Sequence, residues 1–187
     1  MFKKEDIQDI YTLTPMQEGM YYLWKVDVHS TAYFQQCSFR LAGEWEEALL
    51  RESLERLFAR HDVLRTVFAD GLADRLLQVV LKERRPEFRY EDIAHLDAER
   101  QAAFVRAYKE NDCNRLFDLN RDVLFRLAVF RCGRGQTVFY FSYHHILFDG
   151  WCTGLVFSAL FAIYRSLERK EPCPLPEAPP FKNFVRW

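Results

Sequence analysis

The chain has 187 residues, with 26 Lys and Arg against 27 Asp and Glu, and a formal net charge of −1. A chain of this length predicts about one globular domain, and its near-neutral charge excludes the strong basic excess typical of nucleic-acid-binding proteins. The longest predominantly apolar run, Leu155 to Tyr164, is shorter than the roughly 20 residues that a bilayer requires. Met1–Asp9 lacks the apolar core of a signal peptide. We therefore expect a cytoplasmic protein with neither nucleic acid nor membrane as a partner.

Aromatic residues make up 16% of the chain, 17 Phe among them. This content predicts either an unusually aromatic core or a surface that a partner covers. The five cysteines are widely spaced and form no C-x-x-C pair, so they indicate neither a zinc site nor a redox pair. Without a secretion signal, we expect reduced thiols.

The first predicted helix follows Thr14 and runs to about Trp24. Thr14 and Gln17 have the spacing of a capping box, in which each side chain accepts a hydrogen bond from a backbone N–H group at the helix start. A strand is predicted at Tyr33–Leu41. A second helix is predicted at Glu44–Arg60, because its large apolar residues recur at i, i+4, i+7 and i+8.

The middle of the chain predicts a hairpin, a further strand and a third helix. Val63–Ala69 and Arg75–Leu81 flank Asp70-Gly71, a dipeptide typical of hairpin turns. Phe88–Ile93 predicts a strand, and a helix is expected from after Asp97 to about Asn111.

Two strong strands, Val123–Phe130 and Thr137–His145, are predicted on either side of a turn at Gly133–Gly135. The first is apolar on both of its alternating faces, which predicts burial on both. A last helix is expected after Gly150, and five of the seven prolines make Glu171–Pro180 an extended crossing segment. Hairpins alternating with helical crossovers indicate an α/β sandwich with a mixed sheet.

The stretch that carries the most chemistry is Tyr143–Trp151, where a strand ends and a helix is about to begin. Side chains alternate along a strand, so His144 and His145 are expected to point to opposite faces, one into the core and one into a cleft. Opposed directions argue against a shared metal ion, and we predict no metal site. Histidine is well suited to move or orient a proton near neutral pH, although a lone histidine at a strand end is more often structural.

Four segments of the chain carry motifs in a fixed order, namely Leu13–Met20, Arg60–Phe68, His144–Gly150 and Phe181–Trp187. They resemble the opening motif, the RHExLRTxF motif, the HHxxxDG motif and the YxDFxxW motif of condensation domains from nonribosomal peptide synthetases. The departures are conservative, such as Asp62 in the place of the glutamate. Together the four matches span the whole chain, and the family's remaining motifs are absent.

The resemblance implies a chloramphenicol-acetyltransferase-like fold, an α/β two-layer sandwich with a mixed, mostly antiparallel sheet and helices on one face. Condensation domains consist of two such lobes arranged in a V, with the active site between them. The chain resembles the N-terminal lobe. We therefore expect residues 1–170 to form this lobe, and residues 171–187 to form the proline-rich crossing segment and the start of the inter-lobe connection.

The implied reaction is peptide-bond formation, in which the amino group of an acceptor attacks the thioester of an aminoacyl or peptidyl donor. Both substrates arrive on phosphopantetheine arms of upstream and downstream peptidyl carrier proteins, so no covalently bound cofactor is expected. The C-terminal lobe of the same domain and an adjacent adenylation domain are the other implied partners. The isolated lobe is expected to be inactive, because it lacks half of the substrate tunnel.

The resemblance also implies roles for individual residues. His145, the second histidine of the motif, is the implied catalytic residue, acting as a base or by orienting the acceptor amine. His144 is implied to be structural. Asp149 is implied to form a buried ion pair with Arg65, so that either alanine substitution would act by unfolding the protein. Gly150 is expected to allow a tight loop and a close backbone approach.

Other candidate residues have two interpretations each. Met16 and Trp151 are candidates for the tunnel wall, although Trp151 can equally anchor the last helix. Cys152 lies near a predicted helix N-terminus, so a Cys–His nucleophile is an alternative, less favoured than a small buried thiol. Lys82–Arg85 is expected to be a solvated loop rather than a carrier-protein site.

Three other functions remain as alternatives to a condensation domain. An epimerization domain shares the fold and the HHxxxDG motif, but Gly150–Thr153 resembles the DGWS ending of condensation domains. A free-standing acyltransferase that uses coenzyme A is the second alternative, although the RHExLRTxF-like segment and Trp187 favour a synthetase. A binding-only module is the third, although His145 and Asp149 are both intact.

Overall fold

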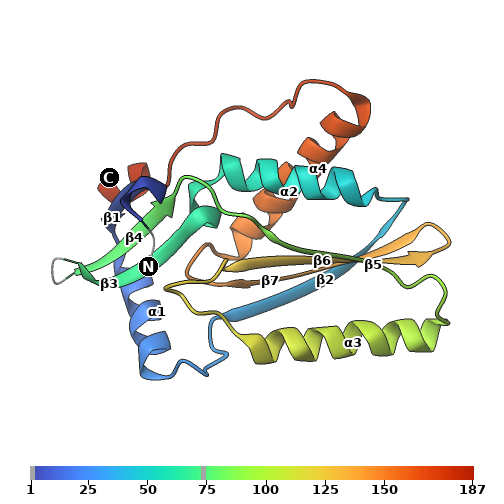
Figure 1. Cartoon of the computed structure of the whole chain (residues 1–187), viewed down its shortest axis with the longest axis horizontal. Helices are drawn as coiled ribbons and strands as arrows, with labels where there is room; N and C mark the ends of the chain where they lie inside the picture. Colours follow the sequence, from blue (N-terminus) through green and yellow to red (C-terminus); the bar gives the residue numbers. More distant parts are fainter. Residues whose placement is uncertain (1–2, 73–74) are drawn as a thin grey trace.

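The computed structural model describes residues 3–72 and 75–187, with the backbone alone at 70–72, and contains two β-sheets (Figure 1). The larger sheet has the strand order β2-β7-β6-β5, and it is antiparallel except for β5, which runs parallel to β6. Its strands are β2 (Phe34–Ala42), β5 (Glu87–Asp92), β6 (Phe125–Gly133) and β7 (Gln136–His144). The smaller, antiparallel sheet has the order β1-β4-β3, formed by β1 (Ile7–Thr12), β3 (Thr66–Leu72) and β4 (Arg75–Leu81).

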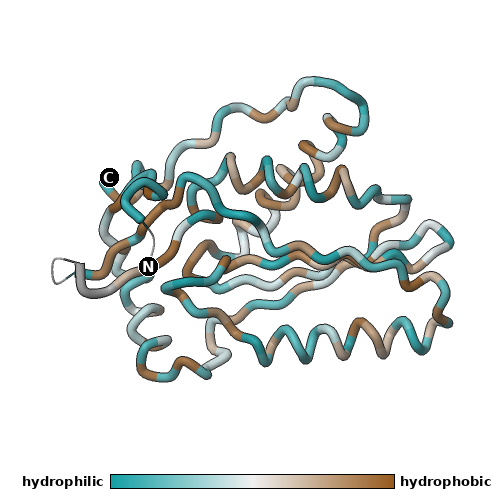
Figure 2. The backbone as a smooth tube through the Cα atoms, in the orientation of Figure 1, coloured by the Kyte–Doolittle hydropathy of each residue, from teal (hydrophilic) through white to brown (hydrophobic). Residues whose placement is uncertain are grey.

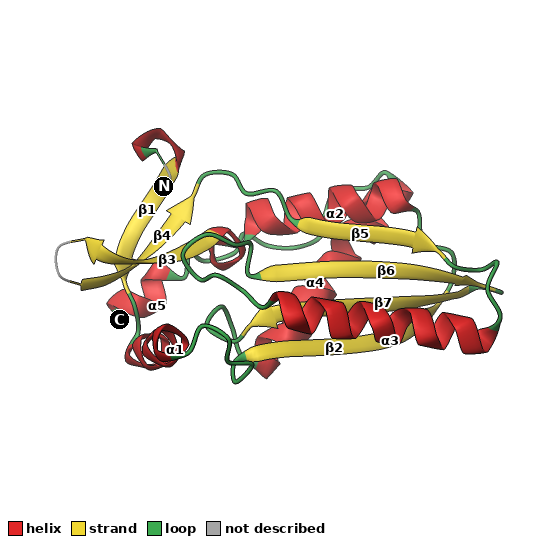
Figure 3. Cartoon of the chain, turned by 60° about the horizontal axis from the view of Figure 1, so that its bottom comes forward, coloured by secondary structure: helices red, strands yellow, loops and turns green. Residues whose placement is uncertain are grey.

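Helices cover both faces of the larger sheet. The five α-helices of the described chain are α1 (Pro15–Val26), α2 (Glu47–Arg60), α3 (Ala98–Arg115), α4 (Gly150–Arg169) and α5 (Lys182–Arg186). Helices α2 and α4 lie on one face of the larger sheet and α3 lies on the other, while α1 and α5 lie beside the smaller sheet (Figures 1 and 3). Short 3-10 turns precede β1 and β3, at Lys4–Asp6 and Asp62–Arg65.

The α/β class with a mixed sheet is confirmed, but the strands form two sheets and the helices do not keep to one face. The reason lies in β6 and β7, whose alternating side chains are buried on both sides. One set packs in the core with α2 and α4, including Leu127, Val129, Phe139 and Phe141. The other set, including Phe130 and Tyr140, packs against Phe104 and Tyr108 of α3. A strand that is apolar on both faces needs cover on both.

The core on the side of α2 and α4 accounts for much of the aromatic content. Figure 2 shows how apolar and polar residues alternate along the elements that enclose it. The Phe39 ring stacks on Phe139 with centroids 5.6 Å apart, and Phe157 meets Phe39 edge-on at 5.1 Å. Such pairs add about 0.5–1.5 kcal/mol each beyond their buried area. By length and composition α4 is apolar enough to cross a membrane, yet one such helix is weak evidence for a membrane span, because core helices pass the same test. The buried residues of α4 pack in this core.

Two elements that sequence analysis missed, β1 and α5, are joined by an ion pair. The Lys182 ammonium group of α5 donates to the Asp9 carboxylate of β1 at 2.7 Å. Strand β1 lies at the edge of the smaller sheet and has a charged residue in its middle, and α5 has only five residues. Neither has the periodicity that identifies an isolated element.

The β3–β4 hairpin is confirmed, whereas the position of its turn differs from the prediction. Strand β3 continues through Asp70 and Gly71 to Leu72, and the residues that join it to β4 lie outside the described residues. Val63, placed in the strand by sequence analysis, belongs to the preceding 3-10 turn. Helix α3 begins after Asp97 as predicted and ends at Arg115, four residues beyond the expected Asn111.

The proline-rich segment contains neither helix nor strand, as predicted. It leaves the end of α4 and passes over α2 toward the smaller sheet (Figure 1). Arg60 donates a hydrogen bond to the Pro176 carbonyl, and Leu175 packs against the core. These contacts bring α5 back to the end of the molecule where β7 meets α4.

Candidate functional site

A cavity of about 450 Å³ lies where β7 gives way to α4. Its lining is largely apolar and comes from all four segments that carry motifs. The opening motif contributes Thr14, Met16, Gln17 and Met20, and the second motif contributes His61, Val63 and Leu64. The residues from His145 to Asp149 form another wall, and the last motif contributes Phe181 and Phe184. Segments far apart in sequence thus meet at a single site.

His145 is held in one orientation and one tautomer. Its Nδ1 lies 2.9 Å from the Phe148 carbonyl oxygen, and its backbone N–H donates to the Tyr33 carbonyl at 2.9 Å. Because a carbonyl oxygen can only accept, Nδ1 carries the proton in the neutral ring, and Nε2 keeps its lone pair. His145 therefore presents a proton acceptor in a cavity that otherwise contains few polar groups.

His144 has a different environment. It is 6% exposed, does not line the cavity, and accepts a hydrogen bond from the Ile146 N–H at its Nδ1, 3.2 Å away. Burial lowers the pKa of His144 to about 4, with a smaller contribution from the neighbouring His145. The two adjacent histidines thus point into different surroundings, as strand alternation predicts, and His144 is neutral near physiological pH.

The expected ion pair between Asp149 and Arg65 is not present. Arg65 is 5% exposed and pairs instead with Asp62 at 2.9 Å, the residue that replaces the motif glutamate. Its guanidinium also donates to the carbonyls of Phe58 and Leu81. Asp149 is exposed and accepts the Cys152 N–H at 3.0 Å, which makes it the N-cap of α4. The prediction is wrong because each group pairs with a partner that is close in sequence. Asp62, three residues before Arg65, binds its guanidinium, and Asp149 accepts a backbone N–H group at the start of α4.

The residues on either side of the α4 N-terminus differ from expectation as well. Gly150 does not have the positive φ that would require glycine, and a Cβ atom placed there would meet no heavy atom within 4 Å. Met16 lines the cavity. Trp151 is 89% exposed and does not line it, and at that exposure it does not anchor the last helix in the core.

The environment of Cys152 disfavours a nucleophilic thiolate. The side chain lines the cavity and is half-buried. Burial raises its pKa, and the hydrogen bond with Asp149 and the negative charge of that carboxylate raise it further. A thiol in this environment stays protonated at neutral pH, where a nucleophilic cysteine needs a depressed pKa.

Two residues at the cavity were not singled out by sequence analysis. Gln17, predicted only as a helix cap, is buried and also donates to the Ile146 carbonyl at 3.1 Å. His61 lines the cavity with a buried Nε2 that has no hydrogen-bond partner among the described residues, and burial is the main cause of its lowered pKa. Both lie within quoted motifs, but no local pattern reveals contacts made 129 residues away.

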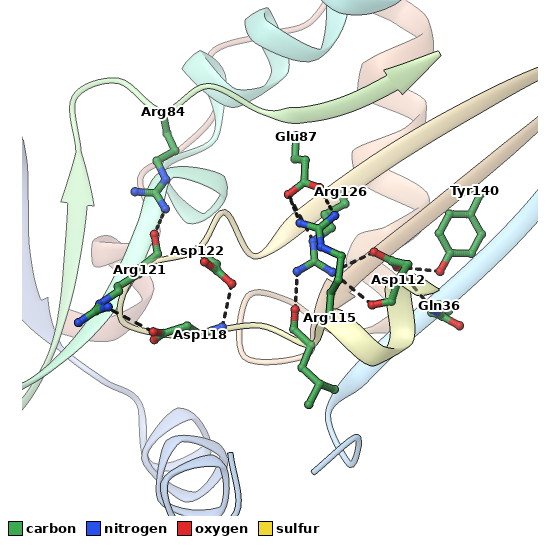
Figure 4. Close-up of polar contacts among 11 residues, drawn as sticks. Gln36, Arg84, Glu87, Asp112, Arg115, Asp118, Arg121, Asp122, Arg126 and Tyr140 are labelled. Carbon is green, nitrogen blue, oxygen red and sulfur yellow. Dashed lines mark hydrogen bonds and ion pairs between the residues drawn. The ribbon is translucent and has the colours of Figure 1, made fainter. Parts of the chain in front are cut away.

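A separate polar cluster lies on the α3 face of the larger sheet (Figure 4). Arg126 and Asp112, both nearly fully buried, form an ion pair at 2.9 Å, and the Tyr140 hydroxyl donates to the same carboxylate at 2.8 Å. Arg126 also lies 3.4 Å from Glu87, and its guanidinium lies 3.9 Å above the Phe117 ring. None of these residues lines the cavity. The cluster joins α3 to the sheet, and within the described residues no group of three or more His, Cys, Asp or Glu could hold a metal ion.

Comparison with known proteins decides the family. A family model described as "Condensation domain" matches residues 7–187. The chain belongs to the condensation-domain family. Gramicidin S synthase 2 of Brevibacillus brevis is 43% identical over 186 residues, which cover 100% of this chain and 4% of that protein. Surfactin synthase subunit 3 of Bacillus subtilis (strain 168) is 38% identical over 186 residues, covering 100% of this chain and 15% of that protein.

A solved structure supports the fold assignment. The starter condensation domain of rhizomide synthetase has a TM-score of 0.85 to this chain at 22% identity, covering 96% of this chain and 44% of that one. This condensation-domain chain therefore spans less than half of a solved condensation domain, and a much smaller share of the curated relatives. The coverage agrees with one lobe of a two-lobed fold.

Proposed function

We propose that this chain is the histidine-bearing lobe of a condensation domain that forms peptide bonds in nonribosomal peptide synthesis. The observation that carries the proposal is a cavity at which all four motif segments meet, lined by His145, whose neutral ring keeps its lone pair on Nε2. The family assignment supports the class of reaction. The apolar walls suit an aminoacyl or peptidyl group that must be kept from water.

The proposed chemistry is attack by an acceptor amine on a donor thioester. A C–N bond forms and the C–S bond breaks; the amine loses a proton, and the departing thiolate gains one. His145 Nε2 either takes the amine proton or orients the amine by accepting its N–H. A positioned base contributes roughly 10²–10⁴-fold, and holding the two substrates together can contribute more.

The proposed partners follow from the same chemistry. Both substrates are carried on phosphopantetheine arms of upstream and downstream peptidyl carrier proteins, and the arms act as substrates rather than as resident cofactors. The second lobe of the same domain closes the cavity, and an adjacent adenylation domain loads a carrier. Exposed apolar side chains flank the cavity at Met16, Leu155 and Phe184, as expected of a surface that the second lobe covers. We propose residues 1–170 as the lobe and 171–187 as the start of the connection.

The test joins this chain to the rest of its condensation domain and measures dipeptide formation between two loaded carrier proteins. We expect His145→Ala to lower the rate by roughly 10²-fold or more. His95→Ala, at an exposed histidine outside the cavity, is the matched control and should leave the rate unchanged. The isolated chain should form no product above background. Full activity of His145→Ala, or dipeptide formation by the isolated chain, would contradict the proposal. Inversion of the donor α-carbon without condensation would instead indicate an epimerase.

A further inference from the structure

We propose that the Gln17 side-chain amide is a positioning group for His145, holding the loop that sets the tautomer and direction of its imidazole. The catalytic consequence rests on the proposed function, whereas the effect on the imidazole does not. Gln17 is 6% exposed, and its Nε2 donates to the Ile146 carbonyl at 3.1 Å. Ile146 directly follows His145 and lies inside the turn that the bond from His145 Nδ1 to the Phe148 carbonyl closes.

The amide of Gln17 has only one orientation that satisfies its partners. Its Oε1 accepts the Thr14 backbone N–H at 3.0 Å, and this capping bond requires an oxygen at that position. The Nε2 end therefore points toward the Ile146 carbonyl, where a donor is required. The helix cap at one end of the amide thus determines which group reaches the loop at the other end.

A second glutamine holds the first. The amides of Gln17 and Gln78 bond to each other reciprocally, at 2.9 Å from Gln78 Nε2 to Gln17 Oε1 and 3.3 Å in the other direction. Gln78, on β4, is 1% exposed and also donates to the Thr12 carbonyl at 3.1 Å. This buried glutamine pair links helix α1 and the smaller sheet to the His145 loop. Buried amides with all partners in place have little freedom to rotate.

Capping alone does not explain a glutamine at this position. Glutamate serves equally well as the third residue of a capping box, but a carboxylate has no N–H to donate to the Ile146 carbonyl. Replacing Gln17 by an apolar residue leaves that buried carbonyl unpaired, and such a group moves or admits water to regain a partner. Either response displaces the turn that fixes the proton on Nδ1 of His145.

The test observes the His145 imidazole by ¹⁵N NMR of the histidine-labelled full chain, at a pH where the ring is neutral. His144→Asn and His145→Asn variants assign the two neighbouring rings among the five histidines of the chain. In the parent chain we expect His145 in the Nδ1–H form alone. In Gln17→Met we expect that single form to be lost and signals from the Nε2–H form to appear. Glu18→Met, the same substitution at the exposed neighbouring residue of α1 outside the cavity, should keep the parent pattern.

The second variant, Gln78→Met, keeps the Gln17 donor but removes the neighbouring amide that holds it. We therefore expect a smaller shift of His145 toward the Nε2–H form. If Gln17→Met does not fold, Gln78→Met alone tests the inference. In the joined domain, Gln17→Met should lower kcat roughly 10- to 100-fold, with KM for both carriers unchanged. An unchanged tautomer in both glutamine variants, or the same change in Glu18→Met, would overturn the inference. A tautomer shift without peptide-forming activity in the parent domain would overturn the proposed function alone.

Discussion

At the scale of single residues, the two adjacent histidines differ because their surroundings differ. His144 is buried with its Nδ1 accepting a backbone N–H, an arrangement that only the neutral ring can make. His145 donates from Nδ1 and lines the cavity. One ring thus belongs to the fold, and the other is available for chemistry.

The buried His144 predicts a pH dependence of stability. The folded chain keeps this ring neutral down to its pKa of about 4, whereas the unfolded chain takes up the proton near 6.5. The unfolded state therefore binds more protons between these values, so the free energy of unfolding falls as pH decreases from 6.5 to 4. The loss is on the order of 3 kcal/mol.

Urea unfolding of the parent chain at pH 7 and at pH 4.5 measures this loss. His144→Asn, whose Oδ1 can accept the same N–H, should show a flatter dependence on pH, and the difference between the two chains separates His144 from the titrating carboxylates. Equal slopes in the two chains would show that His144 does not carry the effect.

The partners of Asp149 and Arg65 predict two different mutational outcomes. Asp149→Ala removes an exposed helix cap and should lower the free energy of unfolding only slightly, while Asp149→Asn should leave it almost unchanged because asparagine also caps. Arg65→Ala removes the buried guanidinium that pairs with Asp62 and donates to the Phe58 and Leu81 carbonyls, and should cost about 3–5 kcal/mol. Denaturant unfolding measures the free energy of unfolding of both variants. Similar losses in Asp149→Ala and Arg65→Ala would instead support the ion pair between these residues that the resemblance implies.

At the scale of elements, the β6–β7 hairpin depends on its glycines. Gly133 pairs with Gln136 across the turn, and the two residues between them, Arg134 and Gly135, both have positive φ. This is the pattern of a type I′ turn, whose twist matches that of the paired strands. Gly133 also has a φ of +77°, and a Cβ atom there would lie 2.9 Å from the Ala94 Cβ.

Gly133→Ala should therefore destabilise the chain by about 1–3 kcal/mol, because the substitution combines a strained φ with a clash. Gly19→Ala is the matched control: it lies in α1, where a Cβ atom has no heavy atom within 4 Å, and it should stabilise the chain by up to about 1 kcal/mol. Thermal unfolding of both variants checks the prediction. A Gly133→Ala chain that melts at the parent temperature would contradict it.

At the scale of the whole molecule, exposed apolar side chains gather near the cavity end. Met16, Tyr22 and Val26 of α1 are at least 60% exposed, as are Leu155 of α4 and Phe184 of α5. Monomeric proteins rarely expose so many large apolar groups in neighbouring elements without a partner. In the proposed function, the second lobe of the domain covers them.

This surface predicts that the isolated chain associates with itself as its concentration rises. The chain joined to the rest of its condensation domain should remain monomeric over the same range, because the second lobe then covers the apolar side chains. Sedimentation velocity on both proteins checks the prediction. A monomeric isolated chain at high concentration would show that these residues are not a lobe interface.

The sequence by itself determined the family, the fold class and most helices and strands, because these depend on local patterns. The capping box at Thr14, the two-sided burial of β6 and each of the four motifs lie in short stretches of sequence. The motif that contains both histidines likewise marked where the site lies. Peptide geometry makes side chains alternate along a strand, so the opposed histidines followed from their adjacency.

The tertiary structure alone decided which groups meet. The partner of Arg65 is one turn away rather than at Asp149, and the second role of Gln17 depends on a carbonyl 129 residues further along. The short elements β1 and α5 and the cover on the second face of the sheet were decided in the same way. A hydrogen bond requires its donor and acceptor atoms to lie within about 3 Å of each other. A local sequence pattern specifies periodicity and helix caps, but it does not specify distances between segments that are remote in sequence.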